Sequence, residues 1–149
     1  MKPDYIICHY AEIGLKGKNR IFFEQALIKN IKRVLKPAYF SNVRRIYGRI
    51  IVELTDKAQS KQNDIKKDLN YVFGLAYFAF ANSANQNLNS IKEKALELLK
   101  DKKFKTFRIS TQRSKKDFVL NSQQINERVG EYILKILQNK NQKIKVNLQ

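Results

Sequence analysis

The sequence predicts an α+β fold, in which segments with the period of a strand alternate with segments that have the period of a helix. Three observations support this class: apolar and polar residues alternate over 50–54, apolar residues recur at helical spacing over 20–36, and a polar stretch over 82–87 separates two halves. A chain of 149 residues has room for one domain or two small ones. We therefore expect one domain over residues 1–81 and a second over residues 82–149.

The first predicted strand covers residues 5–10, which are apolar enough for a strand buried on both faces. A short turn then leads into a predicted helix over 20–36, with Asn19 as its N-cap and Pro37 as its end. The apolar stripe of this helix consists of Phe23, Leu27, Ile28, Ile31, Val34 and Leu35.

A hairpin follows, with one strand over 43–47, a turn at Gly48 and a second strand over 50–54. A second helix, with Gly74 as its C-cap, leads into a fourth strand over 75–81. The apolar positions of that helix are Ile65, Leu69 and Val72. The resulting order, β-α-β-β-α-β, is the split βαβ arrangement of the ferredoxin-like fold.

The second half begins with a predicted helix between residues 88 and 99 and continues with a strand over 105–112. Asn121 and Gln124 have the spacing of a capping box and open another helix. A last strand is predicted over 143–148. Two strands make a poor sheet by themselves, so we expect this α/β domain to be incomplete.

The chain is strongly basic, with 30 Lys and Arg residues against 13 Asp and Glu residues and a formal charge of +17. The excess is shared almost equally, because residues 1–81 carry +8 and residues 82–149 carry +9. Such a balance favours nucleic acid as the partner, with an anionic membrane surface as the second candidate. Both halves should present positive surface.

Several classes are disfavoured by composition. A single cysteine, Cys8, excludes an intrachain disulfide and indicates a cytoplasmic setting, and its place in the first apolar run predicts a buried, inert thiol. One histidine, His9, is too little for a zinc site, so we expect no metal. No apolar stretch is long enough to span a membrane.

The turn after the first strand holds two glycines and the cations Lys16, Lys18 and Arg20, just before a helix N-terminus. Backbone N–H groups and the helix dipole favour an anion there, although a plain basic turn has the same composition. The string Tyr10-Ala11-Glu12-Ile13-Gly14-Leu15-Lys16-Gly17-Lys18-Asn19-Arg20 resembles the N-terminus of the tRNA 4-thiouridine synthetases. These are tRNA sulfurtransferases that are also linked to thiamine biosynthesis.

A second string, Phe107-Arg108-Ile109-Ser110-Thr111-Gln112-Arg113, with Lys116-Asp117-Phe118 and a following helix, resembles the THUMP domain of tRNA-modifying enzymes. The two resemblances imply binding of the tRNA acceptor stem and 3′ end, so that uridine 8 reaches a catalytic domain. They also imply a homodimer, a sulfur-donor protein and an ATP-dependent adenylating domain with an SGGxDS loop. That motif is absent from these residues, so we expect no catalytic residue and no cofactor in this chain.

The candidate RNA-binding residues are the cations nearest these motifs and on the hairpin, because phosphate neutralisation supplies most RNA affinity. They are Lys16, Lys18, Arg20, Arg44, Arg45, Arg49, Arg113, Lys115 and Lys116. Each could instead be an ordinary solvated charge. Among the aromatic residues, Tyr47 and Phe118 are candidates for stacking on a base, with core packing favoured for Phe118. We expect Phe22, Phe23, Phe78 and Phe80 in the core.

Three alternatives stay open from the residues. The chain could be a stand-alone THUMP-type RNA-binding module or a basic ribosome-associated protein, and the fold also occurs in acylphosphatase-like enzymes. Binding to ribosomal RNA without preference for a free 3′ end would favour the second alternative, and phosphatase activity would favour the third.

Overall fold

The computed structural model describes residues 2–11, 17–46, 48–100, 102–114, 117–139 and 145–146, with only the backbone at residues 17 and 18. The chain divides into two compact units, Lys2–Ser83 and Ala84–Gln149. Among the described residues, no helix combines the length and the apolar character that a membrane crossing requires.

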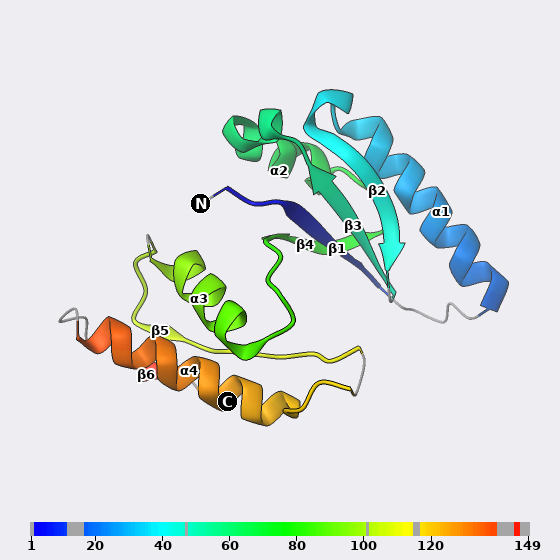
Figure 1. Ribbon diagram of the computed structural model, residues 1–149. Helices are drawn as coiled ribbons and strands as arrows, with labels where there is room; N and C mark the ends of the chain where they lie inside the picture. Colours follow the sequence, from blue (N-terminus) through cyan, green and yellow to red (C-terminus); the bar gives the residue numbers. More distant parts are fainter. Residues whose placement is uncertain are drawn as a thin grey trace. The chain divides into compact units, whose positions relative to one another are not determined.

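The first unit is a four-stranded antiparallel sheet with two helices on one face (Figure 1). The strands are β1 (Tyr5–Tyr10), β2 (Phe40–Ile46), β3 (Arg49–Leu54) and β4 (Leu75–Ala81), in the order β2-β3-β1-β4. The helices are α1 (Gly17–Val34) and α2 (Gln62–Asn70), with short 3-10 turns at Pro37–Tyr39 and Asp56–Lys61. This is the predicted ferredoxin-like order.

The core of the first unit lies between the sheet and the two helices. Alternate residues of β1, Ile6, Cys8 and Tyr10, are buried there because successive strand residues point to opposite faces. From α1 the stripe of Leu27 and Ile31 covers them, and both side chains are almost fully buried. Each such burial contributes roughly 1.5–3 kcal/mol relative to an exposed side chain.

Two predicted boundaries of α1 are wrong. The helix begins at Gly17, so Asn19 lies inside its first turn and is not its N-cap. It ends at Val34, and Pro37 opens the 3-10 turn that follows, where its fixed φ and missing N–H cost nothing. Local sequence signals predicted the helix correctly, but its observed ends differ from the predicted ones by two or three residues.

Gly74 is also not a helix cap. Helix α2 ends at Asn70, where the Tyr71 N–H bonds back to the carbonyl groups of Asp68 and Leu69. Gly74 has φ +89 and turns the chain into β4, and a Cβ there would lie 3.0 Å from the Phe23 ring. Glycine is therefore required by a tight turn against α1 rather than by the helix end.

The second unit pairs α3 (Leu88–Leu99) with α4 (Ser122–Gln138), beside the short parallel strands β5 (Thr106–Phe107) and β6 (Lys145–Val146). The capping box is confirmed: Asn121 and Gln124 exchange side-chain and backbone bonds, at 2.9 Å each. The core of this unit consists of Phe107, Ile125, Val129, Ile133 and Leu137.

Two further predictions are wrong. The strand expected over 105–112 is regular only at Thr106–Phe107, where it pairs in parallel with Lys145–Val146 of β6. Phe22 is 76% exposed, since it lies one position outside the buried stripe of α1. Phe23, Phe78 and Phe80 pack against the core as expected. The other predicted positions of the last strand lie outside the described residues.

Candidate nucleic-acid interface

A buried carboxylate, Glu24 on α1, brings two of the predicted cations together. Arg45 Nη1 of β2 lies 2.9 Å from Glu24 Oε2, and Arg20 Nε lies 3.6 Å from Oε1. The Tyr10 hydroxyl, at the end of β1, donates to the same Oε1. We call these four residues the Glu24 cluster. Among the described residues, Glu24 is the one charged side chain that is buried, and it is 2% exposed.

The charges of the Glu24 cluster keep its carboxylate ionised. Burial by itself raises the pKa of Glu24, but hydrogen bonds from Tyr10 and Arg45 and the charges of Arg45 and Arg20 outweigh it and lower the pKa below its usual 4.5. Burial and the bond to Glu24 raise the pKa of Tyr10. The arginines are 38% and 49% exposed, so one anion holds two guanidinium groups at the surface and leaves a local charge of about +1.

Arg44 and Arg49 lie on the opposite face of the same sheet. Arg44 Nε lies 2.7 Å from Glu53 Oε1 across the β2–β3 hairpin. Arg49 opens β3, where its charge helps to lower the pKa of His9, after the larger effect of burial. Because neighbouring strand residues point to opposite faces, Arg44 and Arg45 cannot serve one site. Lys16 and the stacking candidate Tyr47 lie outside the described residues, as does the side chain of Lys18.

In the second unit the structure places Arg113 at a small polar pocket. Its Nη2 donates to the Phe118 carbonyl at 3.1 Å and so joins the two ends of the predicted basic loop. The pocket has a volume of about 370 Å³ and is lined by Gln86, Ile91, Gln112, Arg113, Ser114, Phe118 and Ile125. Phe118 packs against the core, as expected. Lys115 and Lys116 lie outside the described residues.

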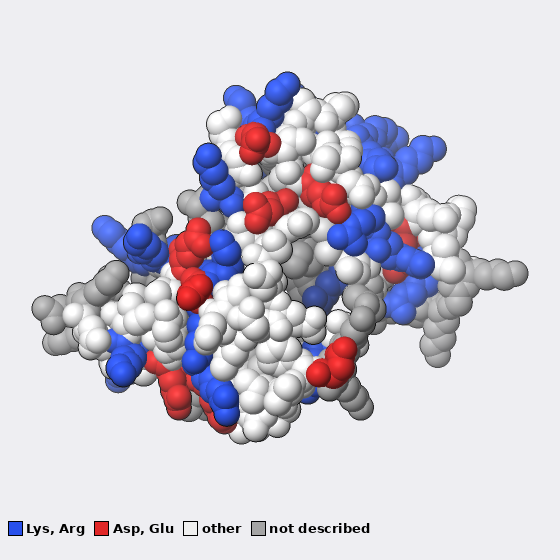
Figure 2. Space-filling view, in the orientation of Figure 1, with Lys and Arg blue, Asp and Glu red and all other residues white. Residues whose placement is uncertain are grey.

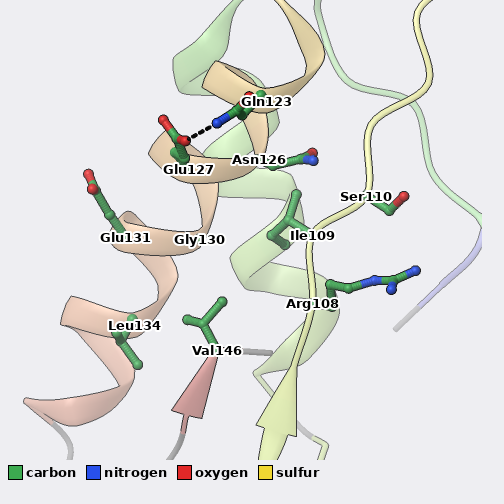
Figure 3. A pocket seen from close by; sticks show the side chains of 10 residues that line it. All are labelled: Arg108, Ile109, Ser110, Gln123, Asn126, Glu127, Gly130, Glu131, Leu134 and Val146. Atoms are coloured by element: carbon green, nitrogen blue, oxygen red, sulfur yellow. Dashed lines mark hydrogen bonds between the residues drawn. The ribbon is translucent and has the colours of Figure 1, made fainter. Parts of the chain in front are cut away.

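A larger hollow of about 790 Å³ beside α4 was not predicted from the sequence (Figure 3). Its apolar lining consists of Ile109, Leu134 and Val146, and Gly130 on the helix leaves room for Ile109 and Val146. Glu127 and Glu131 also line it, and their negative charges disfavour phosphate. Arg108 and Ser110 point away from the helix in Figure 3. In the sequence, Gln123, Asn126, Glu127 and Glu131 recur three and four positions apart around Gly130, and this polar stripe on α4 could have indicated the hollow.

The described cations of the first unit form more than one group, because Arg20 and Arg45 lie on the helix side of the sheet and Arg44 on the other face. Figure 2 shows blue side chains spread over the face in view, with red ones between them. No group of three potential metal ligands occurs in the described part of the chain. The arrangement suits distributed contacts to phosphates better than a single deep anion site.

Comparison with known families accounts for both halves. Residues 5–79 match the family described as ThiI ferredoxin-like domain, and residues 85–149 match the THUMP domain family. The first match alone covers half of the chain. Both agree with the fold described above.

Curated relatives are similar over nearly the whole chain. Proteins named probable tRNA sulfurtransferase are 38% identical in Thermoanaerobacter pseudethanolicus, 37% in Brevibacillus brevis and 36% in Mycoplasmopsis synoviae. These alignments cover 91%, 92% and 97% of this chain. They cover 35%, 34% and 34% of the relatives, so the chain spans about a third of their length.

Two solved structures share the fold. A 4-thiouridine synthetase in complex with RNA and bound ATP is 27% identical with a TM-score of 0.76, over 99% of this chain and 36% of that one. A protein from Pyrococcus horikoshii is 30% identical with a TM-score of 0.78, over 100% of this chain and 48% of that one.

Proposed function

The chain belongs to the ThiI ferredoxin-like domain family, and on that premise we propose that it is the tRNA-binding part of a tRNA sulfurtransferase. In this proposal it positions the acceptor stem and 3′ end so that 4-thiouridine is made at tRNA position 8. The catalytic step belongs to an adenylating domain that uses ATP. A cytoplasmic setting, a homodimer and a sulfur-donor protein complete the proposal.

The observation that carries the proposal is the succession of the two matched domains. A ferredoxin-like domain followed by a THUMP domain extends over 5–149, and a neighbour with the same fold is a synthetase solved with RNA. The charge of +17 supports an anionic ligand of this size. Fold alone would not do so, because the ferredoxin-like arrangement serves many functions.

The candidate contacts are the nine cations predicted from the sequence. Arg20 and Arg45 are oriented by Glu24, and Arg113 is oriented by the Phe118 carbonyl. Guanidinium groups held in this way lose less side-chain entropy when they bind a phosphate. We therefore expect phosphate contacts from both units, with the small polar pocket near Arg113 as a place for unpaired nucleotides.

The test is a titration of the chain with a tRNA acceptor minihelix, with and without its single-stranded 3′ end, at two salt concentrations. We expect a clear preference for the intact 3′ end. The variant in which Arg113, Lys115 and Lys116 become Ala should bind at least about tenfold more weakly, and its salt slope should fall by roughly 2 to 3.

The matched control replaces three exposed cations of the same unit, Lys100, Lys102 and Lys103, by Ala. It removes the same charge and should change affinity little at moderate salt. Equal losses in the two triple variants would contradict the placement of the site. Equal, steeply salt-dependent binding of both minihelices would contradict the tRNA-positioning role itself.

A further inference from the structure

One face of the first sheet points away from α1 and α2, and it carries a row of polar and aromatic side chains instead of apolar core residues. Cys8 of β1 pairs with Ile50 of β3, and both are buried toward the helices. The next positions along these strands, His9 and Arg49, therefore point to the other face. His9 pairs with Tyr77 of β4. Register thus sets Arg49, His9 and Tyr77 side by side across three strands.

The two rings of this row are stacked on each other. The His9 and Tyr77 ring centroids are 4.1 Å apart and the planes differ by 12°. Tyr77 is nevertheless 59% exposed. Because β4 is an edge strand of this sheet, one face of the Tyr77 ring lies on His9 and the other looks past the sheet edge. A flat ring could continue the stack there.

Among the described residues, the surroundings of Tyr77 on this face leave room for a flat ligand. The other residues of β4 on this face are Ala79 and Ala81, which pair with Ile7 and Tyr5. Their methyl side chains project only a short way from the sheet, so they do not block the surface beside Tyr77. Neither His9 nor Tyr77 belongs to the apolar cluster that holds the unit together. The ring pair is therefore not required for packing the core.

The positive charge on this face suits an anionic ligand, and the exposed ring pair favours a nucleic acid over an acidic protein segment. Arg49 stands at one end of the row, and Arg44 is balanced by Glu53 in the neighbouring row. Burial and the Arg49 charge hold the pKa of His9 below its usual 6.5, so the imidazole is neutral at pH 7. A neutral stacked pair beside a guanidinium offers a base platform and a phosphate partner together.

We propose that the open face of the first sheet binds an unpaired base of single-stranded RNA, which stacks on the outer face of Tyr77 while Arg49 contacts its phosphate backbone. This site rests on the proposed function, since it supposes an RNA partner with a single-stranded end. It is distinct from the Glu24 cluster and from the Arg113 pocket, which lie on another face and in another unit.

The first test uses the imidazole as a reporter. His9 is the one histidine of the chain, so its ring protons give one assignable pair of NMR signals. Titration of the full chain with a short oligoadenylate at pH 7 should move these signals upfield as an adenine joins the stack. If the oligoadenylate binds and these signals do not shift, the proposal is overturned. The face would then be a candidate for contact with a protein instead.

The second test compares two tyrosines. Tyr77→Ala should weaken oligoadenylate binding about five- to 150-fold, the effect typical of one base–aromatic stack, and Tyr77→Phe should restore it. Tyr71→Ala is the matched control, because Tyr71 is 85% exposed and lies outside the row. Equal losses in Tyr77→Ala and Tyr71→Ala would overturn the stacking site.

The two proposals fail in different ways. If the acceptor minihelix does not bind the unmodified chain at all, the tRNA-positioning role fails. If the minihelix binds, and Tyr77→Ala binds it and the oligoadenylate as tightly as the unmodified chain does, only the stacking site fails.

Discussion

The two units support a similar positive charge on very different cores. The first unit buries fourteen core residues between a four-stranded sheet and two helices, and the second buries five between two helices and a two-residue strand pair, counting the described residues. Buried apolar area is the main source of stability, so the first unit should be much the more stable of the two.

The two units also differ in how the candidate RNA-binding side chains are oriented. In the first unit carboxylates orient arginines, as Glu24 does for Arg45 and Glu53 does for Arg44. In the second, Arg113 is oriented by a backbone carbonyl of its own loop. The oriented arginines of the first unit therefore depend on pairing with carboxylate side chains, and Arg113 of the second depends on loop conformation.

The largest effect should come from removing one core isoleucine in each unit. Ile31→Ala and Ile133→Ala each remove a fully buried side chain at a cost of about 2–5 kcal/mol. We expect Ile133→Ala to abolish hydrogen-exchange protection of α3 and α4 while β1–β4 stay protected. Ile31→Ala should lower the protection of the first unit without unfolding it. Loss of protection in both units together, in either variant, would show one cooperative body and break the comparison.

The next effect concerns the Glu24 cluster. Glu24→Gln keeps the shape but removes the charge that pairs with Arg45 and Arg20, and we expect a loss of about 1–3 kcal/mol at neutral pH. Because the folded pKa of Glu24 is lowered, its contribution is present above the unfolded value of 4.5 and is lost as the pH falls through the folded pKa. Urea unfolding at several pH values measures this.

Its control is Glu93→Gln, which changes an exposed carboxylate of the second unit and should stay within about 0.5 kcal/mol. The difference between the unmodified chain and Glu24→Gln should shrink in acid. A difference that stays constant from neutral pH to about pH 3 would mean that the ionised carboxylate contributes no stability.

Replacing one glycine of each unit by alanine should change the stability of the two units in opposite directions. Gly74→Ala should destabilise the first unit by more than about 1 kcal/mol, because φ is +89 and the new methyl would meet the Phe23 ring. Gly130→Ala should stabilise the second unit by up to about 1 kcal/mol, because it lies inside α4 and its nearest neighbours, Ile109 and Val146, are at 3.9 Å. Thermal unfolding measures both changes. If the two variants change stability in the same direction, the backbone geometry described for the two glycines is contradicted.

The smallest effect concerns alkylation of Cys8, which should be very slow in the folded protein. Burial raises the pKa of the Cys8 thiol from 9.0 to about 12, so almost no reactive thiolate exists at pH 8 in the folded unit. Alkylation should therefore follow the opening of the first unit and should ignore Ile133→Ala, which acts on the second. Rapid labelling of the unmodified chain would show that the first core opens easily.

Much of the fold could be predicted from the sequence. The period of apolar residues along α1 and β3, and the capping box at Asn121, are local signals that survive in the structure because they agree with the final packing. The exposure of Phe22 was predictable in principle, since it lies one position from the stripe. The short β5 was not, because strand length depends on a neighbour far along the chain.

The candidate site divides in the same way. By itself the sequence determined the net charge, the order of the elements and the identity of the cations near the two motifs, because these depend on residue type and local period. Only the tertiary structure decided that Arg45 joins Arg20 on a buried Glu24, and that His9 stacks on Tyr77. The physical reason is register: contacts between residues 21 to 68 positions apart are set by strand pairing and helix packing, which no local pattern encodes.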